Sequence, residues 1–90
     1  MKYYVIEWDN VDVDDPFRIY VELDRENRIC RQVDFYHVGM GQYYEDLCGE
    51  PVDLAALTGE GSCEEIQRSF FESAVAQAYE LSSGLTGMSL

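Results

Sequence analysis

The stretch FRIYVEL, residues 17–23, decides the fold of this chain, because apolar and polar side chains alternate along its whole length. A period of two is typical of a β-strand with one buried face. A short polar turn separates this stretch from Arg28–Val38, which has a second strand pattern. We expect the two strands to pair as an antiparallel hairpin. The residues expected on its buried face are Phe17, Ile19, Val21, Leu23, Ile29, Val33 and Phe35.

Further elements flank this hairpin on both sides. Residues 2–8 alternate, with Tyr4, Ile6 and Trp8 on one face, and predict a first strand. Gly39–Gly41 is a turn signal, and residues 42–45 after it predict a short fourth strand that completes a meander. Residues 52–57 follow a proline, which favours one or two helical turns there.

The C-terminal part of the chain predicts one long helix. Ser62–Glu65 has the S-x-x-E pattern of a capping box, so we expect the helix to begin there and to run to residue 82. Gly84 is expected to end the helix, and residues 85–90 are expected to fray. The stripe expected to face the sheet is Cys63, Ile66, Phe70, Ala74, Ala78 and Leu81.

These elements predict an α+β fold: a three- or four-stranded antiparallel meander sheet with one main C-terminal helix packed on one face. A chain of 90 residues has material for one hydrophobic core. We therefore expect a single domain over residues 1–84.

The chain is strongly acidic, with 18 acids against 6 bases and a net charge of −12. Such a charge disfavours direct binding to nucleic acid and to anionic membranes. The bases are unevenly placed, because residues 1–44 hold nine acids and five bases, whereas residues 45–90 hold nine acids and one base. The interpretation is either a solvated, solubilising surface or an anionic face that docks on a basic protein.

Three cysteines, without a C-x-x-C pair, fit neither a disulfide framework nor a zinc ribbon, and we interpret them as reduced thiols. The N-terminal residues show no basic region followed by an apolar one, and no apolar run reaches membrane-spanning length. We therefore expect a cytoplasmic protein without membrane insertion.

An acidic loop over residues 7–15 invites a calcium interpretation, because Asn10, Asp12 and Asp14 stand at alternate positions. The pattern fails at its sixth position, where Asp15 replaces the required glycine, and at its twelfth, where Val21 replaces a bidentate glutamate.

The cysteines and the single histidine, His37, suggest two chemical interpretations, as zinc ligands and as a nucleophile with its base. No pair of them is closer in sequence than Cys30 and His37, so the close ligand pairs of zinc sites are missing. Cys30 and His37 also fall on opposite faces of the predicted strand. We expect no metal, no cofactor and no catalytic site, and hence no enzyme.

Tyrosines on the strand faces away from the predicted core suggest contact area for a protein partner. The alternative is that they pack across strands. The residues we expect to bind a partner are Asp9, Asp12, Asp14, Asp15, Tyr20, Tyr36, Tyr43, Glu65 and Glu72.

Several segments together resemble an uncharacterised family of small bacterial domains of unknown function. They are Trp8-Asp9, Asp15-Pro16, Ile19–Asp24, Arg31–Val33 and Gly39, so the resemblance covers about residues 3–39. It implies a bacterial or phage setting and a protein similar in type to small immunity proteins that neutralise toxins.

We therefore predict a small acidic inhibitor, either an immunity protein or a phage-encoded antagonist of a nucleic-acid-targeting defence system. Its partner would be a basic protein such as a nuclease or another nucleic-acid-binding effector. The alternative is a homo-oligomeric accessory domain, such as a homodimer, whose exposed sheet face pairs with itself.

Overall fold

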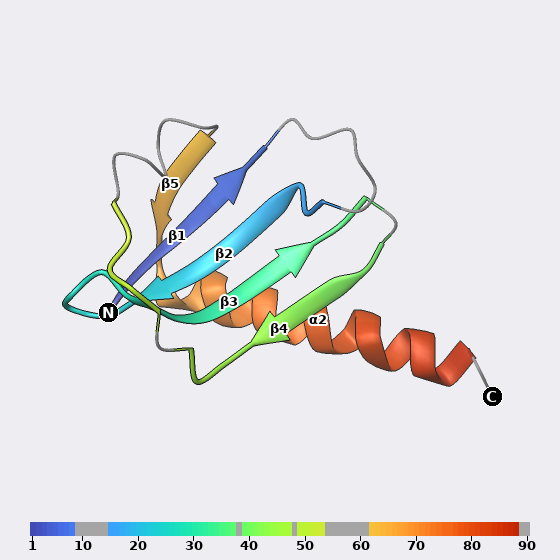
Figure 1. Cartoon of the computed structure of the whole chain (residues 1–90). Helices are drawn as coiled ribbons and strands as arrows, with labels where there is room; N and C mark the ends of the chain where they lie inside the picture. The colour runs from blue at the N-terminus through green and yellow to red at the C-terminus, as the bar shows by residue number, and fades with distance from the viewer. Residues whose placement is uncertain (9–14, 38, 48, 54–61, 89–90) are drawn as a thin grey trace.

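In the computed structural model, which describes residues 1–8, 15–37, 39–47, 49–53 and 62–88, a five-stranded antiparallel sheet carries one helix across one face (Figure 1). The strands are β1 (Lys2–Glu7), β2 (Arg18–Leu23), β3 (Ile29–Phe35), β4 (Gly41–Tyr44) and β5 (Ser62–Ile66), and the helix is α2 (Arg68–Met88). The strand order across the sheet is β4-β3-β2-β1-β5. The predicted α+β class and the helix on one face are confirmed, and the sheet has five strands rather than the predicted three or four.

The β2–β3 hairpin forms as predicted, and its turn is built around Asp24. The Asp24 carboxylate accepts hydrogen bonds from the backbone N–H groups of Glu26 and Arg28, at 2.8 and 3.0 Å. Both bonds lower the pKa of the Asp24 carboxyl group, and the bond from Arg28 has the larger effect. Asn27 adopts a positive φ of 61°, which asparagine tolerates better than most residues. β4 then pairs with β3, so the predicted meander from β1 to β4 is confirmed.

A bulge in β3 places Ile29 on a different face from the one predicted. The register of β2 against β3 shifts between Glu22 and Leu23, so that Cys30 is an extra residue in β3. An extra residue exchanges the two faces of a strand. Ile29 therefore lies on the face away from α2, whereas Val33 lies beneath the helix, and the prediction that both share a face is wrong.

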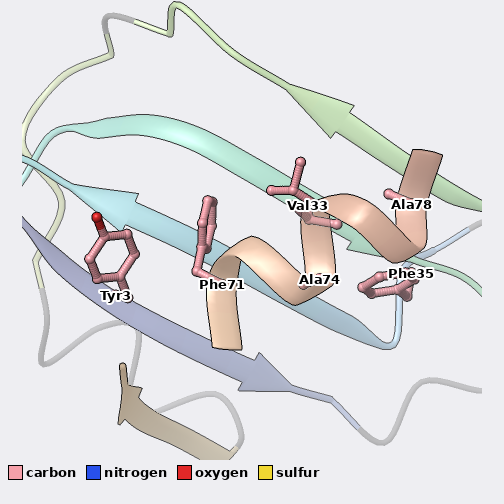
Figure 2. Packing of buried hydrophobic residues seen from close by; sticks show 7 residues of the cluster. Tyr3, Val33, Phe35, Phe71, Ala74 and Ala78 are labelled. Atoms are coloured by element: carbon pink, nitrogen blue, oxygen red, sulfur yellow. The ribbon is translucent and has the colours of Figure 1, made fainter. Parts of the chain in front are cut away.

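Both faces of the sheet bury apolar side chains. The cluster beneath α2 consists of Tyr3, Val33, Phe35, Phe71, Ala74, Val75 and Ala78 (Figure 2). A smaller cluster on the opposite face consists of Ile6, Val21 and Leu23, with Tyr4, Trp8, Ile19, Ile29, Val52 and Cys63 packed against it. The apolar side chains that β2 itself contributes to the predicted core thus lie mainly on the face away from the helix.

The start of the helix is the main error of the sequence-based prediction. Ser62–Ile66 is not the first turn of a helix but an edge strand, with Cys63 opposite Ile6 in β1. This pairing satisfies the backbone groups along the outer side of β1 and places Cys63 against the smaller cluster. Tertiary pairing therefore overrides the local capping signal, and the helix begins at Arg68.

The buried stripe of α2 differs from the predicted one at the first aromatic residue. Phe71 is fully buried, and Ala74, Val75 and Ala78 follow it at helical spacing. Phe70, which was expected to face the sheet, is 61% exposed. Two adjacent phenylalanines fit a helical period almost equally well, so only packing against the sheet selects between them.

One close approach fixes the helix against the sheet at Gly41 in β4. A Cβ atom at this position would lie 3.1 Å from the Cα atom of Ala78 and 3.2 Å from side-chain atoms of Leu81 and Phe35. The helix backbone can therefore approach β4 closely only because residue 41 has no side chain.

The predicted end of the long helix is wrong, and the helical turns predicted over residues 52–57 can be compared with the structure only in part. α2 continues past Gly84, the predicted end, to Met88. Of the helical turns predicted over residues 52–57, residues 54–57 lie outside the described residues. Val52 is described, and its backbone N–H donates a hydrogen bond of 2.8 Å to the carbonyl of Asn27.

Candidate protein-binding surface

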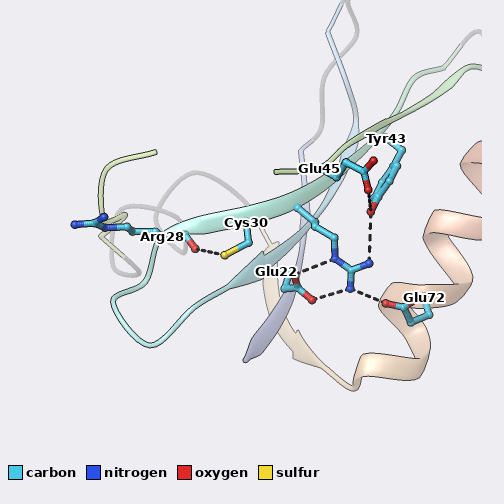
Figure 3. A network of polar contacts seen from close by, with 7 residues as sticks. Glu22, Arg28, Cys30, Tyr43, Glu45 and Glu72 are labelled. Carbon is cyan, nitrogen blue, oxygen red and sulfur yellow. Dashed lines mark hydrogen bonds and ion pairs between the residues drawn. The ribbon is translucent and has the colours of Figure 1, made fainter. Parts of the chain in front are cut away.

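Arg31 lies at the centre of a polar network between the sheet and the first turns of α2 (Figure 3). Its Nε and Nη2 atoms donate to the two carboxylate oxygens of Glu22, at 2.9 and 2.7 Å. Nη2 also donates to Glu72 Oε1 at 2.6 Å, and Nη1 donates to the Tyr43 hydroxyl at 3.5 Å. The guanidinium carbon lies 4.9 Å from the ring centroid of Phe71. Arg31 therefore joins β2, β4 and α2 through one side chain.

The charges in this network stabilise each other. Glu22 is only 6% exposed, and the hydrogen bonds from Arg31 still lower its pKa, against the opposing effect of burial. The same contacts raise the pKa of Arg31. Burial, followed by a hydrogen bond to Glu22, raises the pKa of the Tyr3 hydroxyl. The pair is ionised and bidentate, which is the strongest form of such a contact.

Two further arginines of the central hairpin are also paired with acids of the same chain. Arg18 Nε lies 3.7 Å from Glu7 Oε1, and Arg28 Nε lies 3.2 Å from Glu26 Oε2. These exposed pairs contribute little stability. Their effect on the surface is that much of the positive charge is neutralised within the chain.

Several exposed acids have no such partner. Among the described residues, Glu64 and Glu65 on β5 and Glu80 on α2 are exposed and form no ion pair. The charge of Arg68, beside β5, lowers the pKa of Glu22 and so acts on the Arg31 network. Arg68 is itself exposed and outside the ion pairs of the described residues, so β5 carries two unpaired negative charges next to one unpaired positive charge.

An open groove lies beside the two acids of β5. It has a volume of about 690 Å³ and is lined by Glu64, Glu65, Ile66, Gln67 and Phe70. Phe70 contributes a large, exposed ring to this groove. We call Ser62–Ile66 together with Phe70 the β5 surface.

The structure places the predicted partner-binding residues in different environments. Asp9, Asp12 and Asp14 lie outside the described residues. Asp15 and Glu65 are exposed. Glu72 is exposed but paired with Arg31, so its charge is partly neutralised.

The three predicted tyrosines are less accessible than expected. Tyr20 packs against the cluster beneath α2, with its ring edge-on to Phe35 at 5.7 Å, so its expected exposed position is wrong. Tyr36 is half-buried, and burial followed by the charge of Asp34 raises its pKa. Tyr43 is half-buried between the Arg31 network and the ring of Tyr79, 5.5 Å away. The alternative that the tyrosines pack within the fold therefore describes Tyr20 and Tyr43 better.

The residues of the discarded catalytic interpretation lie at opposite ends of β3. Cys30 Sγ donates to the Arg28 carbonyl at 3.6 Å, and His37 stacks on Phe17 with ring centroids 4.5 Å apart. Seven extended residues span roughly 23 Å. Burial raises the pKa of Cys63, which disfavours its thiolate.

Within the described part of the chain, no group of three or more His, Cys, Asp or Glu side chains is arranged to hold a metal ion. Cys48 and the residues of the calcium interpretation other than Asp15 and Val21 lie outside this part. In the same part of the chain, no helix is long and apolar enough to cross a membrane.

Comparison with known proteins gives no relative: no protein-family model, no curated protein and no solved structure matches this chain. The resemblance over residues 3–39 stays a prediction.

Sequence reasoning missed Glu64 and Phe70 as surface residues, because both were assigned to a helix beginning at Ser62. One signal was present: two adjacent glutamates next to apolar Cys63 and Ile66 also fit an exposed edge strand, where charged residues discourage unwanted pairing.

Proposed function

We propose that this chain is a small acidic protein-binding inhibitor that docks on a basic surface of its target. The target class that fits best is a nuclease or another nucleic-acid-binding effector, because such proteins carry basic grooves that follow phosphate groups. The setting suggested by the resemblance is that of an immunity protein or a phage-encoded antagonist of a defence system.

The observation that carries this proposal is the separation of charge within the fold. Arg18, Arg28 and Arg31 are paired with acids of the chain itself, whereas Glu64, Glu65 and Glu80 have no ion pair within the described residues. A surface with one sign of charge speeds the encounter with an oppositely charged partner and suppresses binding to like-charged ones.

The homo-oligomeric alternative is supported by exposed aromatic side chains on α2, since Phe70 and Tyr79 are 61% and 56% exposed. Self-association through β5 would, however, bring Glu64 and Glu65 of two copies together. Like charges directly opposite each other destabilise a strand pair. We therefore place the alternative second, and light scattering over a range of concentrations tests it.

The proposal is tested by affinity capture from a bacterial or phage-infected lysate at two salt concentrations. The Debye length falls from about 10 Å at 0.1 M salt to about 3 Å at 1 M, so a partner held by charge is retained at the first and released at the second. The captured proteins should be basic, and the chain should block their nucleic-acid binding at stoichiometric amounts. The proposal fails if nothing basic is retained at low salt, or if retention is unchanged at high salt.

A further inference from the structure

The outer edge of β5 ends the sheet in the described part of the chain, because β5 is paired with β1 on its inner side only. In an antiparallel sheet, alternate residues of an edge strand direct their backbone N–H and C=O groups away from the neighbouring strand. These groups form a template for one more strand.

The side chains along this edge define what kind of strand it suits. Glu64 and Glu65 are consecutive, so they point to opposite faces of the sheet, and both are exposed. A strand added beside them would therefore meet a negative charge on each face. Phe70 borders the same groove with an apolar ring that is 61% exposed.

From these observations we propose that the β5 surface binds an extended, lysine- or arginine-bearing segment of the partner as a sixth strand. The inference rests on the proposed function, because it takes the partner to be basic. Main-chain hydrogen bonds to β5 hold the segment, its cationic side chains face Glu64 and Glu65, and one apolar side chain contacts Phe70.

A second copy of this chain is a poorer occupant of the same edge. In an antiparallel self-pairing centred on Glu64, this residue would face its own symmetry mate, and a shift by one residue would place Glu64 against Glu65. Either arrangement juxtaposes like charges, which destabilises the pair. The same acids that repel a second copy attract a cationic strand.

The opposite edge of the sheet provides a control within the molecule. β4 is a strand of four residues, Gly41–Tyr44, and contains no acid. Its Tyr43 is already in contact with Arg31 and Tyr79. A cationic segment should therefore leave the β4 edge unchanged.

The test uses two synthetic peptides of about seven residues, the length of a short strand: in one, two adjacent lysines, which point to opposite faces of a strand, are flanked by valines, and in the other two glutamates replace the lysines. Amide hydrogen exchange of the full chain is followed residue by residue by NMR. With saturating lysine peptide, the outward-facing amides of Ser62–Ile66 should exchange at least about tenfold more slowly, and those of Gly41–Tyr44 should not change. The glutamate peptide should have no effect.

Two double variants with the same net charge show whether the position of the acids or the total charge of the chain determines the effect of the lysine peptide. Glu64→Lys with Glu65→Lys should abolish the effect of the lysine peptide, whereas Glu26→Lys with Glu50→Lys should retain it. All four positions are exposed, and circular dichroism checks that both variants fold. Phe70→Ala should weaken peptide binding.

The inference is overturned if the lysine peptide leaves β5 exchange unchanged, if both peptides protect β5 equally, or if the two double variants behave alike. In any of these cases, salt-sensitive capture of a basic inhibited target would leave the proposed function standing. Loss of that capture as well would reject the proposed function independently.

Discussion

Replacing Glu22 by glutamine tests how much the Arg31 network contributes to stability. The substitution keeps the shape of the side chain but removes the charge that receives two hydrogen bonds from Arg31, at 2.9 and 2.7 Å. Arg31 retains Glu72 at 2.6 Å. The partly buried guanidinium would therefore lose the partner that accepts two of its hydrogen bonds but would keep Glu72.

The expected magnitude follows from the burial of the two groups. Removing one partner of a fully buried pair costs about 3–5 kcal/mol, and an exposed pair contributes about 0–1 kcal/mol. The side chains of Glu22 and Arg31 are 8% and 23% exposed, and Glu72 remains, so we expect a loss of about 2–3 kcal/mol of unfolding free energy. For a domain of this size, that lowers Tm by roughly 10–20 °C.

The pH dependence gives a second readout of the same substitution. The folded-state pKa of Glu22 is lowered from 4.5, so its stabilising contribution is fully present above pH 4.5 and is lost as the pH falls through the folded value. The difference in unfolding free energy between wild type and Glu22→Gln should therefore be constant near neutral pH and should shrink in acid.

Urea denaturation followed by circular dichroism measures both effects. Glu72→Gln is the matched control, because its side chain is 45% exposed and should cost at most about 1 kcal/mol. If Glu22→Gln costs no more than Glu72→Gln, or if its cost is independent of pH down to strong acid, the Glu22–Arg31 pair does not stabilise the fold as expected.

Four further substitutions test the packing and the opposite face by urea denaturation. Phe71→Ala should cost about 3–5 kcal/mol, whereas Phe70→Ala should change stability by less than about 0.5 kcal/mol; equal costs would contradict the helix register. Gly41→Val should cost about 1–3 kcal/mol, because its Cβ would meet helix backbone; an unchanged midpoint would contradict the close approach. Burial raises the pKa of Asp34, so its neutral form stabilises the fold at low pH and this contribution is lost as the pH rises through the folded pKa. Asp34→Asn should therefore increase stability at pH 7 but not in strong acid, and a loss at pH 7 would contradict this.

The elements that could be predicted from sequence are those specified by local alternation and by turn residues. Residues 17–23 alternate cleanly, residues 29–35 have apolar side chains at positions 29, 33 and 35, and Asp24 and Asn27 build a turn between the two strands, so their pairing needs no distant information. The bulge at Cys30 has no such local signal. It arises from pairing, and it reverses the face of Ile29.

The errors at β5 and in α2 have one common cause. Ser62–Glu65 satisfies the local rule for a helix start, but the open side of β1 also needs a partner, and the strand pairing satisfies more backbone groups. Once the helix begins at Arg68, the sheet selects Phe71 rather than Phe70 as the buried ring. An element that depends on a distant strand is the kind that local patterns predict least well.

The acidic character of the candidate surface is a product of folding as much as of composition. Four of the five arginines in the sequence lie on the central hairpin, and the fold directs Arg31 inward against Glu22 while it places Glu64 and Glu65 on an edge strand. An arginine that is held beneath a helix neutralises the acids it contacts but screens little of the charge on a distant edge. The negative charge at β5 therefore has two effects. It discourages pairing between copies, and it makes the same edge selective for a cationic strand.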